Sequence, residues 1–421
     1  MTTSDPTAAG SPSEAFVWVW LPGASTPVVA GRIDQVGQEC VFTYGRSYLA
    51  RAEAIPLYAP ELPLREGRIA PMGGLAIAGC LRDAGPDAWG QRVILARRLG
   101  HLDPAVDTGT LSTLTYLLES GSDRIGALDF QRSATEYVPR CAEHPSLEQL
   151  QDAAARLTAG EELAPGLADA LLRGTSIGGA RPKVTLLDAT GRPVIAKLST
   201  QTDPYPVVKF EAAAMALAAR VGIDVARTRM VRSLGKDVLL VDRFDRPGGG
   251  RRSLMVSALT ILGLDEFTGA RYASYLDLAD QVRARFREPR ATLAELFRRL
   301  VFNVCVSNGD DHARNHAAIW DGTALSLTPA YDLSPGLRSG DTATQAMALT
   351  RDGRRSSRLA LCRQTASEYL LRDDDAERII DEVVSGIASH FDEVAELAQL
   401  TAIERAQLKR LVLHPSIHHP E

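Results

Sequence analysis

Lysine is scarce in this chain of 421 residues. Only five of its 47 basic residues are lysines, and the formal net charge is −5. This acidic balance argues against a dedicated, uniformly basic nucleic-acid-binding protein. Genomic base composition can by itself produce a preference for arginine over lysine, without functional meaning. In so arginine-rich a chain, however, the closely spaced Lys183, Lys197 and Lys209 are candidates for positions that need a compact ammonium.

Long apolar runs and paired cysteines are absent as well. No stretch approaches the roughly 18 apolar residues of a membrane-spanning helix. The N-terminus has neither the basic nor the apolar region of a secretion signal. The five cysteines are widely separated and form no CxxC pair, which excludes a disulfide framework and a cysteine-based zinc site. We therefore expect a cytoplasmic protein with no membrane contact.

Apolar patterning predicts several folded parts. Residues alternate between apolar and polar over 16–21, 26–33 and 39–44, as in a small antiparallel sheet, before a helical stretch at 87–118 and a strand at 123–130. Further strands are predicted at 183–187, 193–199, 227–234 and 236–244, with helices at 209–222, 270–286, 291–307, 357–371 and 375–412 and a hairpin at Asp321-Gly322. The expected divisions are a disordered tail (1–14), an N-terminal α/β subdomain (15–132), a connecting helical segment (133–172), a β-rich lobe (173–246) and a helical lobe (247–421).

A glycine pair precedes the strand predicted at 183–187. Ser176-Ile177-Gly178-Gly179-Ala180 is able to present backbone N–H groups to phosphate oxygens. The segment matches neither the P-loop nor GxGxxG, and it leads into a strand rather than a helix. A plain turn is the more frequent structure for such a pair, so this motif decides nothing alone.

Lys197 lies on the next predicted strand among apolar neighbours. An ammonium on a half-buried strand needs a partner, and Glu211 in the following helix is the candidate. A strand lysine paired with a helix glutamate is the arrangement with which protein kinases hold ATP phosphates. The alternative is an edge lysine whose ammonium reaches solvent.

Two polar segments further on match the kinase pattern. Asp310 precedes Asn315 by five positions, the spacing of the catalytic aspartate and the Mg²⁺-binding asparagine in HRDxxxxN, whereas Asp311 does not fit this spacing. Asp332 lies where kinases place the aspartate of DFG, although the triplet here is Asp-Leu-Ser. An ordinary helix end and a turn are the alternative interpretations.

The order of these elements is more informative than any one of them. The motifs follow one another as in a protein kinase. Their order is glycine loop, strand lysine, helix glutamate, helical lobe, DxxxxN, hairpin and final aspartate. We therefore predict phosphoryl transfer with ATP and Mg²⁺. The fold class expected is α+β and two-lobed, with a β-rich first lobe, an all-helical second lobe and an extra N-terminal α/β subdomain.

The chain resembles the HipA family of serine/threonine kinases, the toxins of persistence-linked bacterial toxin–antitoxin pairs. The resemblance extends from residue 16 to about 400. The segments that carry it are FTYGRSYL (42–49), GPDAWGQR (85–92), YLLESGSDRIGALDF (116–130), SIGGARPK (176–183), IAKL (195–198), VDRFDR (241–246), DDHARNH (310–316) and PAYDLSP (329–335).

The resemblance implies a role for each matching residue. Asp310 would be the catalytic base, Asn315 and Asp332 would hold Mg²⁺, and Lys197 would bind ATP phosphate. Ser176 would be an autophosphorylation site whose charge repels ATP and switches the enzyme off. The other nucleotide-binding residues implied are Gly178, Gly179, Ala180, Arg181, Pro182, Lys183, the hinge residues Asp242, Arg243 and Phe244, and His312, Ala313, Arg314 and Tyr331. The chain departs from the family pattern at Arg181, usually Gln, and at Asp242, commonly Glu.

Resemblance also implies partners. The protein substrate would be an aminoacyl-tRNA synthetase, most often glutamyl-tRNA synthetase, and the antitoxin a small HipB-like helix-turn-helix protein. The chain shows no helix-turn-helix of its own, so operator DNA is expected only through the antitoxin. The cluster Arg351, Arg354, Arg355 and Arg358 is either a solvated face or a contact to DNA phosphates.

Two other functions stay open from sequence. A small-molecule kinase of the aminoglycoside or choline type shares the Asp…Asn…Asp set. That class tends to place His two residues before the catalytic aspartate, where this chain has Asn308. The second alternative is a catalytically silent, antitoxin-bound repressor component, although every expected catalytic residue is present.

Overall fold

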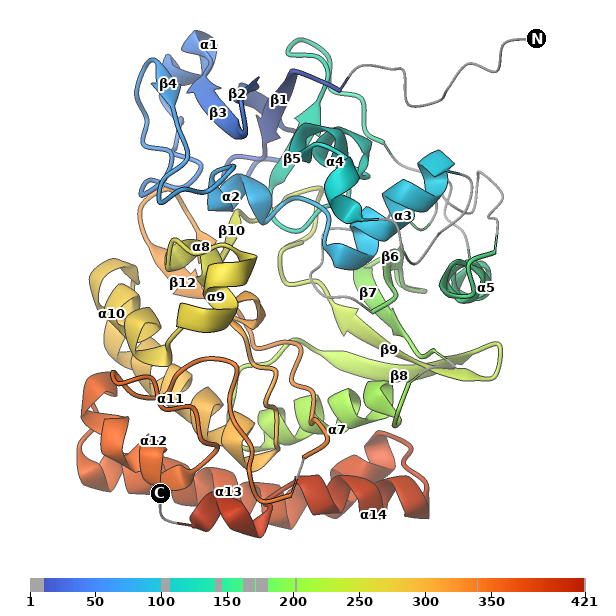
Figure 1. Cartoon of the computed structure of the whole chain (residues 1–421), viewed down its shortest axis with the longest axis vertical. Coiled ribbons are helices and arrows are strands. Elements are labelled where there is room, and N and C mark those ends of the chain that lie inside the picture. The colour runs from blue at the N-terminus through green and yellow to red at the C-terminus, as the bar shows by residue number, and fades with distance from the viewer. Residues whose placement is uncertain are drawn as a thin grey trace.

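The computed structural model contains three antiparallel sheets in the residues that it describes (Figure 1). Those residues are 11–99, 107–140, 146–161, 171, 181–200, 203–338 and 340–419. Their strand orders are β4-β3-β2-β1-β5, β6-β7-β9-β8 and β10-β11-β12. In Figure 1 the five-stranded sheet and the helices α13 and α14 lie at opposite ends of the molecule. The four-stranded sheet lies between them, beside the second lobe.

The N-terminal sheet confirms the antiparallel sheet predicted from alternation. Its strands are β1 (Glu14–Val19), β2 (Val28–Val36), β3 (Glu39–Tyr44), β4 (Arg68–Ile69) and β5 (Leu128–Gln131). Gly31 in β2 is required by close packing, because a Cβ there would lie 2.2 Å from the Thr43 carbonyl oxygen and 2.7 Å from the Phe42 ring. Helices α1 (Arg46–Leu49), α2 (Gly79–Arg82), α3 (Ala88–Leu99) and α4 (Thr113–Glu119) complete this part.

The four-stranded sheet presents its two faces to different surroundings. It consists of β6 (Lys183–Leu187), β7 (Pro193–Leu198), β8 (Thr228–Ser233) and β9 (Lys236–Asp242), close to the predicted strands. Val184, Val194 and Ala196 pack on one face against α3, α4 and α5 (Leu147–Thr158). Lys183 and Lys197 are cross-strand partners. Since successive side chains alternate between faces, both lysines point to the other face, on the side of α7 (Val207–Arg220).

The second lobe is mainly helical. Its helices are α8 (Ala258–Ile261), α9 (Glu266–Tyr272), α10 (Tyr275–Arg285), α11 (Pro289–Cys305), α12 (Leu359–Thr365), α13 (Asp373–Leu397) and α14 (Ala402–Leu411). Helix α13 packs against α11 and also against α7 of the first lobe. The 25 residues of α13 bury one side only. None of the helices in the ranges given above is both long and apolar enough to cross a bilayer.

Two details of this lobe differ from the sequence prediction. The lobe is not all-helical, because β11 (Ala317–Trp320) and β12 (Leu325–Leu327) form the predicted hairpin, and β11 also pairs with β10 (Met255–Ser257). The sequence did not predict β10, because three residues are too few to show the alternation of a strand. The single helix expected over 375–412 is two helices, since Gln399 adopts a left-handed φ of 55° and Thr401 begins α14 with a capping box.

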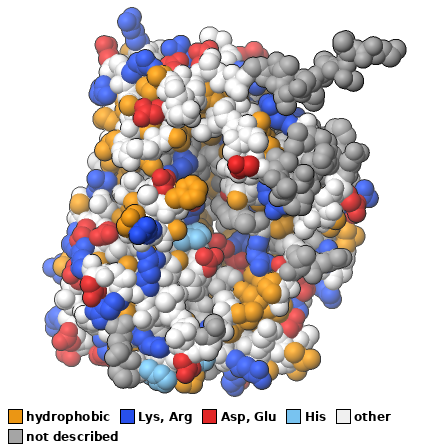
Figure 2. Space-filling view, viewed as in Figure 1, with side chains coloured by type: hydrophobic (Ala, Val, Ile, Leu, Met, Phe, Trp, Pro, Cys, Tyr) orange, Lys and Arg blue, Asp and Glu red, His pale blue; other side chains and the backbone are white. Residues whose placement is uncertain are grey.

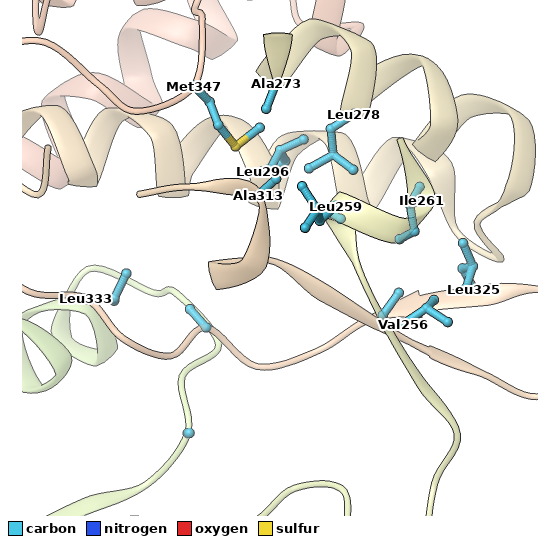
Figure 3. Close-up of a cluster of buried hydrophobic side chains, with 14 of the residues drawn as sticks. Val256, Leu259, Ile261, Ala273, Leu278, Leu296, Ala313, Leu325, Leu333 and Met347 are labelled. Carbon is cyan, nitrogen blue, oxygen red and sulfur yellow. The ribbon is translucent and has the colours of Figure 1, made fainter. Parts of the chain in front are cut away.

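Buried apolar side chains support the segment that carries the candidate catalytic residues. Ala313 belongs to the short 3₁₀ helix η3 (Ala313–Asn315) and is 2 % exposed. Figure 3 shows it within a cluster of side chains from β10, β12, α8, α10 and α11, namely Val256, Leu325, Leu259, Ile261, Leu278 and Leu296. The backbone between Asp310 and Asn315 is therefore anchored to the core at Ala313.

Candidate active site

A cleft between the four-stranded sheet and the second lobe collects most of the predicted site residues. Between its atoms the cleft contains about 900 Å³ of empty space, a figure that includes solvent at its open mouth. Figure 2 shows acidic, basic and histidine side chains beside one another in a hollow near the middle of this face. The predicted residues that line the cleft are Lys183, Lys197, Glu211, Asp242, Arg243, Phe244, His312, Arg314, Asn315, Tyr331 and Asp332.

Lys197 of β7 joins two carboxylates from distant segments. Its Nζ lies 2.5 Å from Glu211 Oε1 on α7 and 2.5 Å from Asp332 Oδ1. Burial favours the neutral amine, but Asp332 and Glu211 outweigh it and raise the pKa of Lys197. Burial likewise opposes ionisation of Asp332, yet Lys197 lowers the pKa of that carboxyl to about 2. Lys197 is therefore a cation and Asp332 an anion at neutral pH.

The backbone at Asp332 is in an uncommon conformation. Its φ is 58°, in the left-handed region that few residues with a Cβ adopt, although aspartate tolerates it better than most. The preceding Tyr331 donates its hydroxyl to the Arg314 carbonyl oxygen at 2.8 Å. This bond ties the Asp332 segment to the segment that carries Asn315.

The second lysine of the cleft is bound by the N-terminal part of the chain. Lys183 Nζ lies 3.3 Å from Asp87 Oδ2, and both side chains are buried. Asp87 precedes α3 and accepts the Gly90 N–H at 2.7 Å. Burial raises the pKa of Asp87, while Lys183 acts in the opposite direction. The N-terminal part thus supplies the counter-charge for a cation on the cleft face of the sheet.

Asp310 and Asp311 are adjacent but have opposite surroundings. Asp311 is buried and binds Asn303 Nδ2 and His316 Nε2, each at 2.8 Å, and the Tyr275 hydroxyl. Burial opposes its ionisation, but His316 and these donors lower the pKa of Asp311. Asp310 is exposed, and its carboxylate accepts no hydrogen bond from the described residues. Asp311 therefore has a structural role, while Asp310 is accessible to a substrate.

The surroundings of Asp310 also affect its ionisation. Nearby protein removes enough water to raise the pKa of Asp310, and the negative charges of Asp332 and Asp311 act in the same direction. His312 acts in the opposite direction. A raised pKa makes a carboxylate a better proton acceptor, which suits a general base.

Asn315 and Asp332 fit the requirements of a magnesium ion. Asn315 Nδ2 donates to the Asp310 carbonyl oxygen at 3.3 Å, whereas its Oδ1 accepts no hydrogen bond from the described residues. Mg²⁺ is usually held by one or two protein oxygens, with water and substrate phosphate as the other ligands. The described residues contain no group of three His, Cys, Asp or Glu side chains arranged to hold a metal ion. Asn315 and Asp332 have side-chain oxygens of the kind that Mg²⁺ binds.

The chain after β9 forms the opposite end of the cleft. The rings of Phe244 and Tyr331 lie with their centroids 5.8 Å apart and their planes tilted by 35°, and Ile195 and Val241 line the same cleft. In the described part of the chain the Phe244 N–H donates to no backbone carbonyl. Apolar walls with an available amide donor are the chemistry that binds a purine base. At the start of this segment, the Asp242 carboxylate accepts a hydrogen bond from Arg229 Nη1 at 3.0 Å.

Several predicted residues lie elsewhere. Arg181 pairs with Asp203 at 2.7 Å, Pro182 borders separate surface grooves, and Ala313 is in the core. Ser176, Gly178, Gly179 and Ala180 lie outside the described residues, so their roles stay predictions. Sequence reasoning missed seven residues that line the cleft, Asp83, Ile125, Ile195, Val241, Asp245, Met255 and Ser257. Four of them, Ile125, Ile195, Val241 and Asp245, lie in the resembling segments 116–130, 195–198 and 241–246, whereas the other three lie in none of the quoted segments.

The arginine cluster near the C-terminus is engaged with protein groups. Arg351 binds Asp280 and Glu368, and Arg354 binds Gln364. Arg355 and Arg358 donate to backbone carbonyls, including that of Ser416 at 2.6 Å from Arg358. These contacts favour a structural role for the cluster.

Two lobes with an intervening cleft, in which a strand lysine meets a helix glutamate, define an α+β fold of the protein-kinase type. Family models agree with this class and narrow it. Residues 175–391 match the HipA-like C-terminal domain, and residues 19–131 match the HipA N-terminal domain. The chain belongs to the HipA family.

Known proteins extend the comparison. The fold is similar to that of HipA of Shewanella oneidensis MR-1, which was solved with HipB and its operator DNA. The TM-score is 0.70 and the sequence identity 19 %, and the match covers 95 % of this chain and 96 % of that one. The kinase CtkA of Helicobacter pylori gives a TM-score of 0.43 and 14 % identity over 57 % of this chain and 92 % of CtkA. A Sinorhizobium fredii protein named "Putative kinase Y4mE" is 28 % identical over 272 residues, 58 % of this chain. The match spans 60 % of that relative's length.

Proposed function

We propose that this protein is an ATP-dependent serine/threonine protein kinase and the toxin of a toxin–antitoxin pair. The observation that carries the proposal is the position of Lys197 between Glu211 and Asp332, in a cleft that also contains an apolar end with an available amide. Family membership supports the same function.

Side chains that line the cleft, together with the exposed Asp310, have parts in this chemistry. Lys197, oriented by Glu211, binds ATP phosphate, and Lys183 supplies a second positive charge on the same face. Asp310 orients the substrate hydroxyl and accepts its proton. Asn315 and Asp332 hold Mg²⁺, which when bound neutralises phosphate charge.

Nucleotide binding and its control involve the remaining predicted residues. The backbone of Asp242, Arg243 and Phe244 binds adenine, with Tyr331 against the base. Gly178, Gly179, Ala180, Arg181 and Pro182 line the phosphate side, with His312, Ala313 and Arg314 nearby. Autophosphorylation of Ser176 inactivates the enzyme, because a dianion next to ATP phosphates is repelled.

The proposed partners follow from the family. A HipB-like helix-turn-helix antitoxin binds the protein in the cytoplasm and connects it to operator DNA. The protein substrate is an aminoacyl-tRNA synthetase. The structural likeness to a HipA solved with HipB and operator DNA supports the antitoxin part.

Mass spectrometry after incubation with Mg²⁺ and ATP tests the proposal. The wild type should gain one phosphate at Ser176 and transfer phosphate to a purified synthetase, and Asp310→Gln should do neither. Asp352→Gln, the same change at an exposed aspartate, should behave as the wild type. Phosphorylation of an aminoglycoside or choline alone would favour a small-molecule kinase. ATP turnover in neither assay would favour the silent repressor component.

A further inference from the structure

Asp83 of the N-terminal domain reaches the cleft between the two lobes. It is the residue that follows α2, and its side chain is only 7 % exposed. Asp83 lines the cleft together with Arg314, although it lies far in sequence from every kinase motif. A carboxylate that is largely removed from water needs polar partners. The partners of Asp83 therefore indicate what it does in the cleft.

Ser257 is the first partner of this carboxylate. Its N–H donates to Asp83 Oδ2 at 2.7 Å, and its hydroxyl donates to Asp83 Oδ1 at 2.9 Å. Ser257 ends β10, and its side chain caps α8. The next residue, Ala258, donates its N–H to the His316 carbonyl oxygen at 2.7 Å. Asp83 is therefore connected through β10 and α8 to the end of residues 310–316, here called the catalytic segment.

Arg314, within the catalytic segment, is the second partner. Its Nη1 lies 3.7 Å from Asp83 Oδ1, and the same guanidinium pairs with Glu266 of α9. Burial opposes the charge of Arg314, but Asp83 and Glu266 outweigh it and raise the pKa of Arg314. The Glu266 side chain is 57 % exposed, so water screens its charge. Asp83 is therefore the anion of this pair that water screens less.

Arg314 adjoins both residues proposed to hold Mg²⁺. It directly precedes Asn315, and its carbonyl oxygen accepts the Tyr331 hydroxyl at 2.8 Å. Tyr331 in turn directly precedes Asp332. A rotation of the Arg314 backbone would thus move the side chains of Asn315 and Asp332 relative to each other. Contacts that orient metal ligands in this indirect way affect metal affinity and activity strongly.

The N-terminal domain holds Asp83 in place. The Glu61 carboxylate accepts the N–H groups of Gly79 and Cys80, both at 2.8 Å, and so caps the start of α2. In Figure 1, α2 lies beside β10 and α8, with which it is in contact. A Cβ at Gly79 would lie 2.6 Å from Thr260 Oγ1 of α8, so glycine allows this close approach. The helix that leads into Asp83 is thus fixed at its start and packed against the second lobe.

We propose that Asp83 is a positioning residue for phosphoryl transfer, through which the N-terminal domain holds the catalytic segment in its active geometry. The inference rests on the proposed function, because it assumes that Asn315 and Asp332 act on Mg²⁺–ATP. Both Asp83 oxygens accept hydrogen bonds from Ser257, and Oδ1 also faces Arg314. Asp83 therefore acts through these two residues and not on the reacting atoms.

Asp83→Asn removes the charge and keeps the size of the side chain. The amide oxygen can still accept the Ser257 N–H, and the amide NH₂ can donate to Ser257 Oγ, so the attraction to Arg314 is the main loss. Steady-state phosphate incorporation by the full chain should show a kcat about tenfold below the wild-type value, with the KM for Mg²⁺–ATP nearly unchanged. Asp381→Asn, the same change at an exposed position of α13, is the matched control and should behave as the wild type.

Two further measurements separate positioning from a general loss of structure. Calorimetric titration of Asp83→Asn with adenosine should give wild-type affinity and stoichiometry, because a smaller folded fraction would lower the stoichiometry. Arg314→Gln leaves Asp83 and its bonds to Ser257 in place, and it should also lower kcat. In the double variant, Asp83→Asn should lower kcat by less than about twofold beyond the effect of Arg314→Gln, because contacting residues that act together are not additive.

Each outcome decides between the possibilities. Wild-type kcat in a folded Asp83→Asn would overturn the inference and leave the proposed function intact. Additive losses in the double variant, or adenosine binding weakened by Asp83→Asn, would overturn it as well. If Asp83→Asn does not fold, Arg314→Gln decides alone, and wild-type kcat in that variant would contradict the inference. A wild type that incorporates no phosphate would overturn the proposed function itself.

Discussion

Lys197 Nζ and Asp332 Oδ1 lie 2.5 Å apart although 135 positions separate the two residues in the chain. Glu211 shares the same ammonium, so one cation faces two carboxylates at this point. Burial raises the pKa of Glu211 and the negative charge of Asp332 acts in the same direction, whereas Lys197 opposes them. Lys183, in contrast, is paired with Asp87 from the N-terminal part. Lys183 and Lys197 therefore have different electrostatic surroundings.

Lys197→Met should lower the kcat/KM of autophosphorylation by about 100-fold, because a charged contact to phosphate is lost from a water-poor site. The variant also leaves Glu211 buried without its cation, which lowers the free energy of unfolding by about 3 kcal/mol. Urea unfolding and phosphate incorporation measure the two effects.

The double variant Lys197→Met/Glu211→Gln distinguishes the two causes. It removes the unpaired carboxylate, so stability should largely recover while phosphate incorporation stays low. Recovery of both would show that Lys197 acts only through stability. Lys409→Met, at an exposed position on α14, is the control for the loss of a lysine.

The adjacent aspartates should respond differently to the same change. Asp310→Asn should abolish phosphate incorporation and leave the free energy of unfolding near the wild-type value, because its carboxylate accepts no hydrogen bond from the described residues. Asp311→Asn should cost about 1–3 kcal/mol, since it disrupts charged hydrogen bonds to His316, Asn303 and Tyr275. Urea denaturation and a phosphorylation assay on both variants check this. A stable Asp311→Asn or an active Asp310→Asn would contradict the assignment of roles.

Asp129 should make folding stability depend on pH in the acid range. Burial opposes its ionisation, but Arg124 and Arg140 lower the pKa of Asp129 to about 2. Because the folded-state pKa is below the ordinary value, this contribution is complete above about pH 4 and is lost as the pH falls towards 2. Its size is about 2 kcal/mol. The free energy of unfolding, measured with urea, should differ less between pH 5 and pH 3 in Asp129→Asn than in the wild type. The exposed Asp381→Asn variant should behave as the wild type.

Gly31→Ala should destabilise the N-terminal sheet far more than Gly37→Ala in the adjacent turn. At Gly31 the new Cβ would meet backbone at 2.2 Å, so β2 and β3 must separate, at a cost of about 3 kcal/mol or more. At Gly37 nothing lies within 4 Å, and only the left-handed φ of 60° is unfavourable, by about 1 kcal/mol. Equal unfolding free energies for the two variants would contradict this account.

Local pattern predicted much of the fold. The strands β3 and β6 have the predicted ends, because alternation of apolar residues reflects burial within a single segment. The order of motifs placed Lys197, Glu211, Asn315 and Asp332 in one site, and the structure brings these four to one cleft. Spacing also separated Asp310 from Asp311 before their surroundings were known.

Contacts between distant segments were decided only by the tertiary structure. Three such relationships depend on how the N-terminal part packs on the lobes, so no pattern in the sequence predicted them. They are the pairing of Asp87 with Lys183, the position of Ile125 in the cleft, and the pairing of Asp123 with Arg243. Lys209, the third of the closely spaced lysines, pairs with Glu404 at 3.1 Å and so connects α7 to α14. Sequence patterns indicated most of the strands and helices and the kinase order of motifs, because both are encoded within segments. Packing decided the ion pairs that belong to no motif, such as Lys183 with Asp87 and Arg243 with Asp123, because these pairs depend only on distance in space.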